Sequence, residues 1–173
     1  MLCTYLVCLC TGQAHSALCN NIINDCQDHL QEVLDKWDSI DDEIWAKIVV
    51  LERNRRVAKA YARAPVLTVN GTDQGFDGFR IGLSGFENPM RDSKTRDCKG
   101  QIGAGCKLKM DDSGNILVKR LAKSAIYVKN TLEENSVSND ILKLPGGLLE
   151  QEKPFKLFDM SCVVDEINEC IVL

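Results

Sequence analysis

Residues 45–71 constrain the fold of this chain most strongly, because their pattern predicts consecutive β-strands closed by a turn. Residues 45–51 are rich in apolar and β-branched side chains, as expected of a strand that is buried on at least one face. In residues 57–63 alanine alternates with larger side chains, so one face is small enough to lie close beneath another layer. The strand pattern resumes at residues 66–69 and ends on Asn70-Gly71, a turn signal in which both residues tolerate positive φ. The segment therefore predicts the opening strands of a β-domain.

Composition excludes several classes of protein. A chain of 173 residues with 45% hydrophobic and 27% charged residues is long enough for one domain with a substantial core and has a globular composition. Its net charge of −4 gives no basic footprint for nucleic acid, so we expect no direct nucleic-acid binding. No apolar run approaches the ~20 residues that a transmembrane helix needs, so we expect no transmembrane segment.

The nine cysteines argue against both a disulfide framework and a metal centre. Their number is odd, their spacing is irregular and no Cys-x-x-Cys pair occurs. The two histidines, His15 and His29, are far from a second cysteine pair, so we predict no metal site. Most of the cysteines are expected to be reduced and buried in a cytoplasmic protein.

The N-terminal 17 residues leave two readings open. Residues 2–10 are apolar, and the small residues at 14–17 resemble a signal-peptide cleavage site, but no lysine or arginine occurs before Lys36. Secretion of a cysteine-rich protein, with a glycan on the Asn70 sequon, is therefore the alternative to a segment that packs on the domain or frays.

Residues 16–37 are the clearest predicted helix. Apolar residues recur at steps of three and four and form one continuous stripe, while polar residues occupy the other side. The stripe could recruit a separate helix, but we favour docking on the chain's own β-domain, because the stripe ends directly beside it. The predicted docking face consists of Ile22, Ile23, Cys26, Leu30, Val33, Leu34 and Trp37.

The remainder of the chain predicts further short strands. They fall at residues 79–83, 106–110, 116–120, 125–128 and 141–144, with a hairpin turn at 111–115. Lys153 begins a predicted helix, because Pro154 suits a first turn and apolar residues continue at helical spacing to Ile171.

Residues 84–100 are predicted to form a long charged loop, which in a compact domain is usually functional or mobile. Arg91, Lys94, Arg96 and Lys99 form a local basic cluster within it. The simpler interpretation is a solvated loop, and the functional alternative is a binding site for an acidic or phosphorylated ligand.

No catalytic constellation occurs. Both histidines lie in or before the predicted N-terminal helix, far from any candidate nucleophile, and the paired carboxylates all fall in turns or linkers. The glycines at 103–105 precede a strand rather than a helix N-terminus, so they do not predict phosphate binding. We therefore predict a binding module that is not an enzyme and has no cofactor.

Five blocks of sequence resemble the MAD-homology 2 (MH2) domain, the C-terminal domain of Smads. The blocks are residues 45–71 with the charged run 52–57, then 79–83, 102–106, 121–128 and 142–147. The resemblance implies a mainly β fold with helices, a Smad/FHA-type β-sandwich over residues 44–160. An N-terminal helical region at residues 1–43 precedes it and a divergent tail at 161–173 follows.

The resemblance also implies function through protein contacts. In Smads the domain docks on receptors, forms trimers and recruits transcriptional partners. A helix directly ahead of the domain is similar to the Expansion group of Smad-like proteins, which implies a cytoplasmic adaptor at the apical cortex that controls chitin deposition in epithelia, including airway tubes. Its implied partners are the apical chitin-synthesis machinery or Smads. The alternative is a nuclear co-regulator that binds Smads and alters transcription.

Three departures from the Smad pattern qualify this resemblance. No basic DNA-binding domain precedes the helix, and residues 169–173 lack the serine pair that receptor kinases phosphorylate. The family would continue beyond Met160 with further strands, a receptor-contacting loop and a final helix, so we expect the C-terminal part of the sandwich to be truncated. A truncated sandwich exposes strand edges, which favours pairing with another chain and hence an oligomer.

Overall fold

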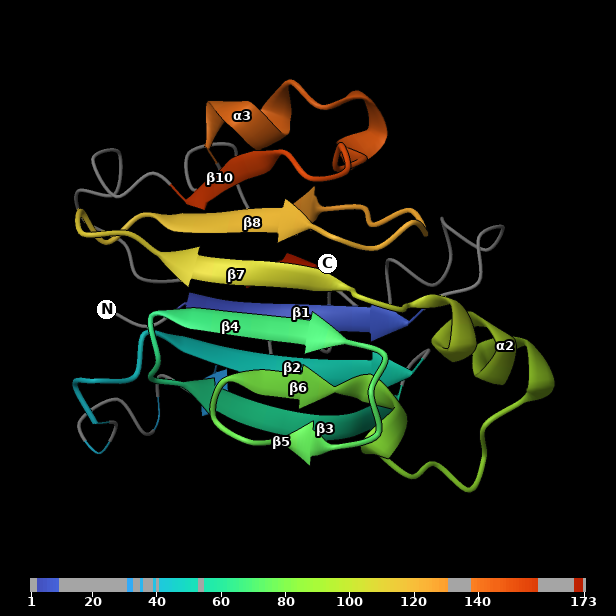
Figure 1. The fold of residues 1–173 in the computed structure, drawn as a ribbon. Helices are drawn as coiled ribbons and strands as arrows, with labels where there is room; N and C mark the ends of the chain where they lie inside the picture. Colours follow the sequence, from blue (N-terminus) through green and yellow to red (C-terminus); the bar gives the residue numbers. More distant parts are fainter. Residues whose placement is uncertain are drawn as a thin grey trace.

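Two β-sheets packed face to face form the body of the molecule in a computed structural model of the chain (Figure 1). The structure describes residues 3–9, 31–32, 35, 39, 41–52, 55–130, 138–158 and 170–172. The predicted fold class, a β-sandwich with few helices, is confirmed.

The first sheet has five strands in the order β3-β2-β1-β11-β9. Their bounds are β1 (Cys3–Leu9), β2 (Ala46–Glu52), β3 (Arg55–Ala62), β9 (Lys129–Asn130) and β11 (Cys170–Val172). β2 and β3 form an antiparallel hairpin, which confirms the two strands predicted at the start of the domain. β1 lies between β2 and β11 and runs parallel to both, so the apolar N-terminus contributes a strand inside this sheet.

The second sheet has six strands in the order β10-β8-β7-β4-β6-β5. They are β4 (Val66–Asn70), β5 (Gly75–Phe76), β6 (Arg80–Gly82), β7 (Cys106–Met110), β8 (Ile116–Arg120) and β10 (Pro154–Phe158). The predicted strands at 66–69, 79–83, 106–110 and 116–120 are confirmed, although Leu83 lies in the short 3-10 helix η2 (Leu83–Gly85) rather than in β6.

The core lies between the two sheets and is formed by alternate residues of each strand. Ala46, Ile48 and Val50 of β2 are no more than 1% exposed, as are their counterparts Leu67, Leu108 and Val118 in the second sheet. The Trp45 indole is buried at the start of β2, and its Nε1 donates a hydrogen bond of 2.8 Å to the carbonyl of Ala64. The strands predicted at residues 45–51, 66–69, 106–110 and 116–120 therefore supply much of the core, and β10 (Pro154–Phe158) adds Phe155, Leu157 and Phe158.

Helix α2 (Ser93–Gln101) corrects the prediction that residues 84–100 form a loop. Asp92 caps this helix, because its Oδ1 accepts a hydrogen bond of 2.9 Å from the backbone N–H of Thr95. Figure 1 shows α2 at the right-hand end of the sandwich, beside the ends of the strands. A charged segment without an apolar stripe thus forms a helix here because its cap and its contacts at the end of the sandwich support it.

Three other predictions near the C-terminus are wrong. The strand predicted at 141–144 is the short helix α3 (Asn139–Leu142), which Ser138 caps, followed by the 3-10 helix η3 (Pro145–Gly147). The helix predicted from Lys153 is strand β10, which pairs with β8, and Cys170–Val172 is strand β11 rather than helix. Residues 125–128 make only a single bridge, between Tyr127 and Leu148.

Gly105 lies in the tight connection between α2 and β7 and allows its conformation. It has a φ of +61°, and a Cβ atom at this position would collide with the carbonyl oxygen of Val69. Its own carbonyl accepts hydrogen bonds of 2.8 Å from the backbone N–H groups of both Leu121 and Ala122. Only glycine satisfies this combination of conformation and close approach.

Candidate protein-interaction site

On the outer face of the β2–β3 hairpin, the β2 side chains are buried although they point away from the sandwich core, whereas Arg56 and Lys59 of β3 remain partly exposed. Lys47 lies opposite Tyr61, Val49 opposite Lys59 and Leu51 opposite Arg56. The side chains of Lys47, Val49 and Leu51 are at most 1% exposed. We call this surface the hairpin face. Because residues of an exposed sheet face would remain open to water, the burial shows that the β2 half of the hairpin face is covered by another part of the chain.

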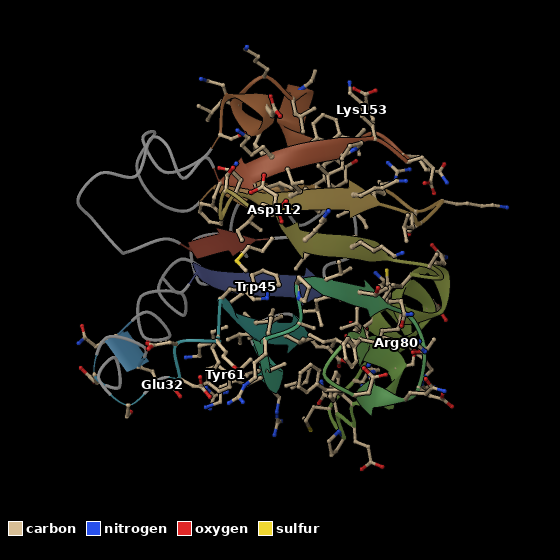
Figure 2. The ribbon with its side chains drawn as sticks, turned by 60° about the vertical axis from the view of Figure 1, so that its left-hand side comes forward. Glu32, Trp45, Tyr61, Arg80, Asp112 and Lys153 are labelled. Carbon is tan, nitrogen blue, oxygen red and sulfur yellow. The ribbon has the colours of Figure 1, made fainter. Side chains whose placement is uncertain are left out.

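Glu32 lies on the hairpin face, in a helical turn with Gln31. Its carboxylate accepts hydrogen bonds from Lys59 Nζ at 2.8 Å, Lys47 Nζ at 3.1 Å and Arg56 Nη1 at 3.4 Å. Figure 2 shows Glu32 beside the outer side of β3, where Tyr61 is labelled. One carboxylate from the N-terminal region is thus bound by three cations of the hairpin.

The electrostatics of the hairpin face favour an anionic partner. The hydrogen bond from Lys59 is the largest cause that lowers the pKa of Glu32 to about 2, against an opposing effect of burial, and the hydrogen bond from Lys47 lowers it further. Burial lowers the pKa of Lys47, whereas the hydrogen bond to Glu32 raises that of Lys59. The side chain of Lys47 is fully buried, so its charge needs an anion beside it. The hairpin face can therefore recognise a carboxylate presented by a helix.

A second charge cluster fixes α2 to the end of β2. The carboxylate of Glu52, with a side chain 1% exposed, accepts hydrogen bonds of 2.8 Å from Arg91 Nη2, 2.6 Å from Lys99 Nζ and 2.8 Å from Asn88 Nδ2. Burial alone would raise the pKa of Glu52, but the hydrogen bonds from Arg91, Lys99 and Asn88 outweigh it and hold that pKa below its usual value. The carbonyl of Phe86 accepts further hydrogen bonds from Arg91 and Lys99. This cluster positions α2 rather than binding an external ligand.

The four residues of the predicted basic cluster fall into two groups in the structure. Arg91 and Lys99 bind Glu52, whereas Lys94 and Arg96 are exposed on α2 and make no ion pair within the described residues. An anionic ligand for this segment stays a prediction and rests on Lys94 and Arg96.

The predicted helix docking face lies outside the described residues. This is true of all seven positions: Ile22, Ile23, Cys26, Leu30, Val33, Leu34 and Trp37. Docking through them stays a prediction. Sequence reasoning placed Glu32 on the polar side of the helix and missed its contact. The available signal was the run of cations on residues 55–59, which needs a counter-charge if its strand is covered.

The described ranges hold neither a metal site nor a membrane-spanning helix. No group of three or more His, Cys, Asp or Glu side chains in them could hold a metal ion. None of the helices described there is long and apolar enough to cross a membrane. Cys98 and Cys106 are free thiols, and burial raises the pKa of Cys106 to about 12, so this thiol is unreactive.

Comparison with known proteins gives a family. No curated protein matches the chain. A chain in the crystal structure of STAT2 in complex with IRF9 is similar, with 16% identity and a TM-score of 0.46 over 62% of this chain and 60% of that chain. The interferon regulatory factor 9 IAD domain is similar with 20% identity and a TM-score of 0.41, over 62% of this chain and 53% of that chain. The model of the MH2 domain family matches residues 43–170, well over half of the sequence. The chain therefore belongs to the MH2 domain family, whose members are protein-interaction modules of the Smad type.

Proposed function

We propose that this chain is a Smad-type adaptor that works by protein contacts, with its own N-terminal helix docked on the hairpin face. The observation that carries the proposal is the binding of Glu32 by Lys47, Arg56 and Lys59 on a buried sheet face, within a chain that belongs to the MH2 family.

The apolar stripe of residues 16–37 supplies the cover for the hairpin face. Val49 and Leu51 need an apolar partner, and the stripe runs along the segment that contains Glu32. Docked in this way, the helix buries apolar surface while Glu32 neutralises the cations at its margin. The docked unit then presents its remaining surfaces to partner proteins.

In the cell, we assign the adaptor to apical chitin deposition and epithelial tube formation. The support is the resemblance to the Expansion group, in which a helix lies directly ahead of an MH2 domain. The test is to remove the gene and stain epithelial chitin with a fluorescent chitin-binding probe. We expect reduced or misplaced chitin and an apical position for the tagged protein. Normal chitin in the absence of the protein would contradict the assignment.

A co-regulator of Smads is the second candidate function. The apolar side chain of Met90, 76% exposed and three residues before the start of α2, favours it because it offers contact surface beside that helix, and Phe79 in the turn before β6 is 68% exposed as well. Co-precipitation with Smads and nuclear accumulation would support this function over the first. Loss of co-precipitation in Met90→Glu, with thermal stability unchanged, would place the contact beside α2.

A further inference from the structure

The six-stranded sheet carries one sign of charge. None of its strands contains aspartate or glutamate, although the whole chain has a net charge of −4. The guanidinium of Arg120 is used internally, since it donates hydrogen bonds to the carbonyls of Ala122, Lys123 and Leu149. The other five cations of these strands form a surface that we call the basic face: Arg80, Lys107, Lys109, Lys119 and Lys156.

The register of the strands puts these five residues on the same side of the sheet. Residues opposite each other in neighbouring strands point to the same face. Lys107 lies opposite Thr68 on one side and Lys119 on the other, and Thr68 lies opposite Arg80. In the next row, Leu117 lies opposite both Lys109 and Lys156. The alternate residues of these strands are in the core, so the basic face is the outer face of the sandwich.

The basic face is open. Figure 1 shows the six-stranded sheet toward the viewer, with α2 at one end and α3 beyond β10, neither of them across the sheet. Figure 2 labels Arg80 and Lys153 toward opposite edges of this sheet. Lys107 and Lys109 are exposed and make no ion pair within the part of the chain that the structure describes.

Within the described ranges, the acidic groups that interact with these cations, Glu152, Asp77 and Asp111, lie at the margin of the basic face. Glu152, two residues before the start of β10, forms an ion pair of 2.8 Å with Lys119. Asp77, in the turn before β6, accepts hydrogen bonds from the backbone N–H groups of Phe79 and Arg80, which lower its pKa, and the charge of Arg80 lowers it further. The centre of the face, at Lys107 and Lys109, is therefore its most positive part.

The clustering of lysines on this face destabilises the sheet, so the stability of the fold does not account for it. Lys107 and Lys119 lie directly opposite each other, and like charges in that relation destabilise a pair of strands. An acidic residue at either position would relieve the repulsion. We propose that the basic face binds an extended acidic segment of a partner protein, whose carboxylates compensate these cations.

The spacing of the lysines identifies the form of the partner. Lys107 and Lys109 are two residues apart in one strand, so their side chains emerge at a spacing of about 6.8 Å. An extended peptide presents alternate side chains at the same spacing, so acidic residues at every second position match the lysines. The net negative charge of the whole chain disfavours the longer-range attraction that nucleic acid or an anionic membrane would require. This surface is separate from the hairpin face, so the inference goes beyond the proposed docking of the N-terminal helix.

The test uses the full chain and a fluorescein-labelled peptide of alternating glutamate and threonine, with binding followed by fluorescence anisotropy at low salt. We expect wild-type protein to bind, the affinity to fall as salt is added, and the double variant Lys107→Gln, Lys109→Gln to lose about tenfold or more in affinity. The matched control is Lys123→Gln, Lys143→Gln, which removes the same charge from two exposed positions outside the strands of the sheet and should retain the wild-type affinity. A peptide of the same composition with its glutamates consecutive should bind more weakly.

Thermal unfolding of both double variants confirms that they fold, since all four side chains are on the surface. Failure of the wild-type chain to bind the peptide overturns the proposal, and so does an equal loss of affinity in the two double variants. Equal or tighter binding of the peptide with consecutive glutamates overturns the alternate spacing. Binding of phosphatidylserine vesicles without binding of the peptide overturns it in favour of a lipid surface.

Discussion

At the scale of single residues, Glu52 is the charge on which the position of α2 depends. Its replacement in Glu52→Gln leaves Lys99, 5% exposed, without a counter-charge in a buried place. Removing one partner of a buried pair costs about 3–5 kcal/mol. We therefore expect Glu52→Gln to lower the free energy of unfolding by that amount in urea titrations. Glu152→Gln is the control, because its ion pair with Lys119 is exposed and should cost less than about 1 kcal/mol.

Gly105 and Gly100 predict opposite effects of the same substitution. Gly105→Ala places a Cβ against the carbonyl of Val69 at a positive φ, so we expect a loss of about 3 kcal/mol or more, or failure to fold. A Cβ at Gly100, in α2, meets no atom within 4 Å. Gly100→Ala should therefore stabilise the protein by about 0.5–1 kcal/mol, through helix propensity. Thermal unfolding measures both effects. A mild effect of Gly105→Ala would contradict the close approach of Gly105 to the carbonyl of Val69.

The ion pairs of Glu32 predict a specific dependence of stability on pH. The folded pKa of Glu32, about 2, is below its ordinary value of 4.5, so its stabilisation is fully present above pH 4.5 and is lost as the pH falls toward 2. At pH 7 we expect Glu32→Gln to cost about 1–2 kcal/mol. In urea unfolding, the difference between wild type and variant should shrink through this window. A difference that stays constant would show that the carboxylate charge is not what binds the hairpin. Glu150→Gln, an exposed i,i+3 pair with Lys153, is the control.

At the scale of elements, alternation in the sequence was a reliable guide where a strand has one buried face. β4, β7 and β8 lie where the pattern placed them, because each sends alternate residues into the core. For β10 the sequence wrongly predicts a helix, since a proline suits a first helical turn as well as the start of an edge strand, and β10 is an edge strand. Short apolar runs such as 141–144 fit either element, and here the Ser138 cap decides for a helix.

Helix α2 has a hydrophobic stripe too weak to predict it, so its formation depends on its ends. Asp92→Ala removes the cap of the first turn, and we expect it to cost about 1 kcal/mol and to lower Tm by about 2–4 °C. Asp97→Ala, in the middle of the same helix and exposed, should change stability by less than about 0.5 kcal/mol. Equal effects of the two substitutions would contradict the role of the cap.

At the scale of the whole molecule, the two outer faces of the sandwich differ in whether their cations are paired with a carboxylate of the chain. On the hairpin face the chain supplies Glu32 to three cations, whereas at the centre of the basic face Lys107 and Lys109 are left open to solvent. The sequence predicted the domain, its family and its opening strands. It could not show the position of β1 beside β2 or the contact of Glu32. β1 pairs with residues 43 positions later, and Glu32 contacts cations 15 to 27 positions later, and local patterns do not encode such contacts.

Zero-length carbodiimide cross-linking tests most directly the central claim, that the N-terminal region lies on the hairpin face of its own chain. The reaction joins a carboxylate to a lysine amine that touches it, and Glu32 lies 2.8 Å from Lys59 Nζ and 3.1 Å from Lys47 Nζ. We predict that peptide mass spectrometry of the monomeric fraction finds Glu32 joined to Lys59, and that Lys59→Arg removes this product. Absence of the Glu32–Lys59 product from the monomer, with Glu32 joined instead to lysines outside the hairpin, would contradict the claim.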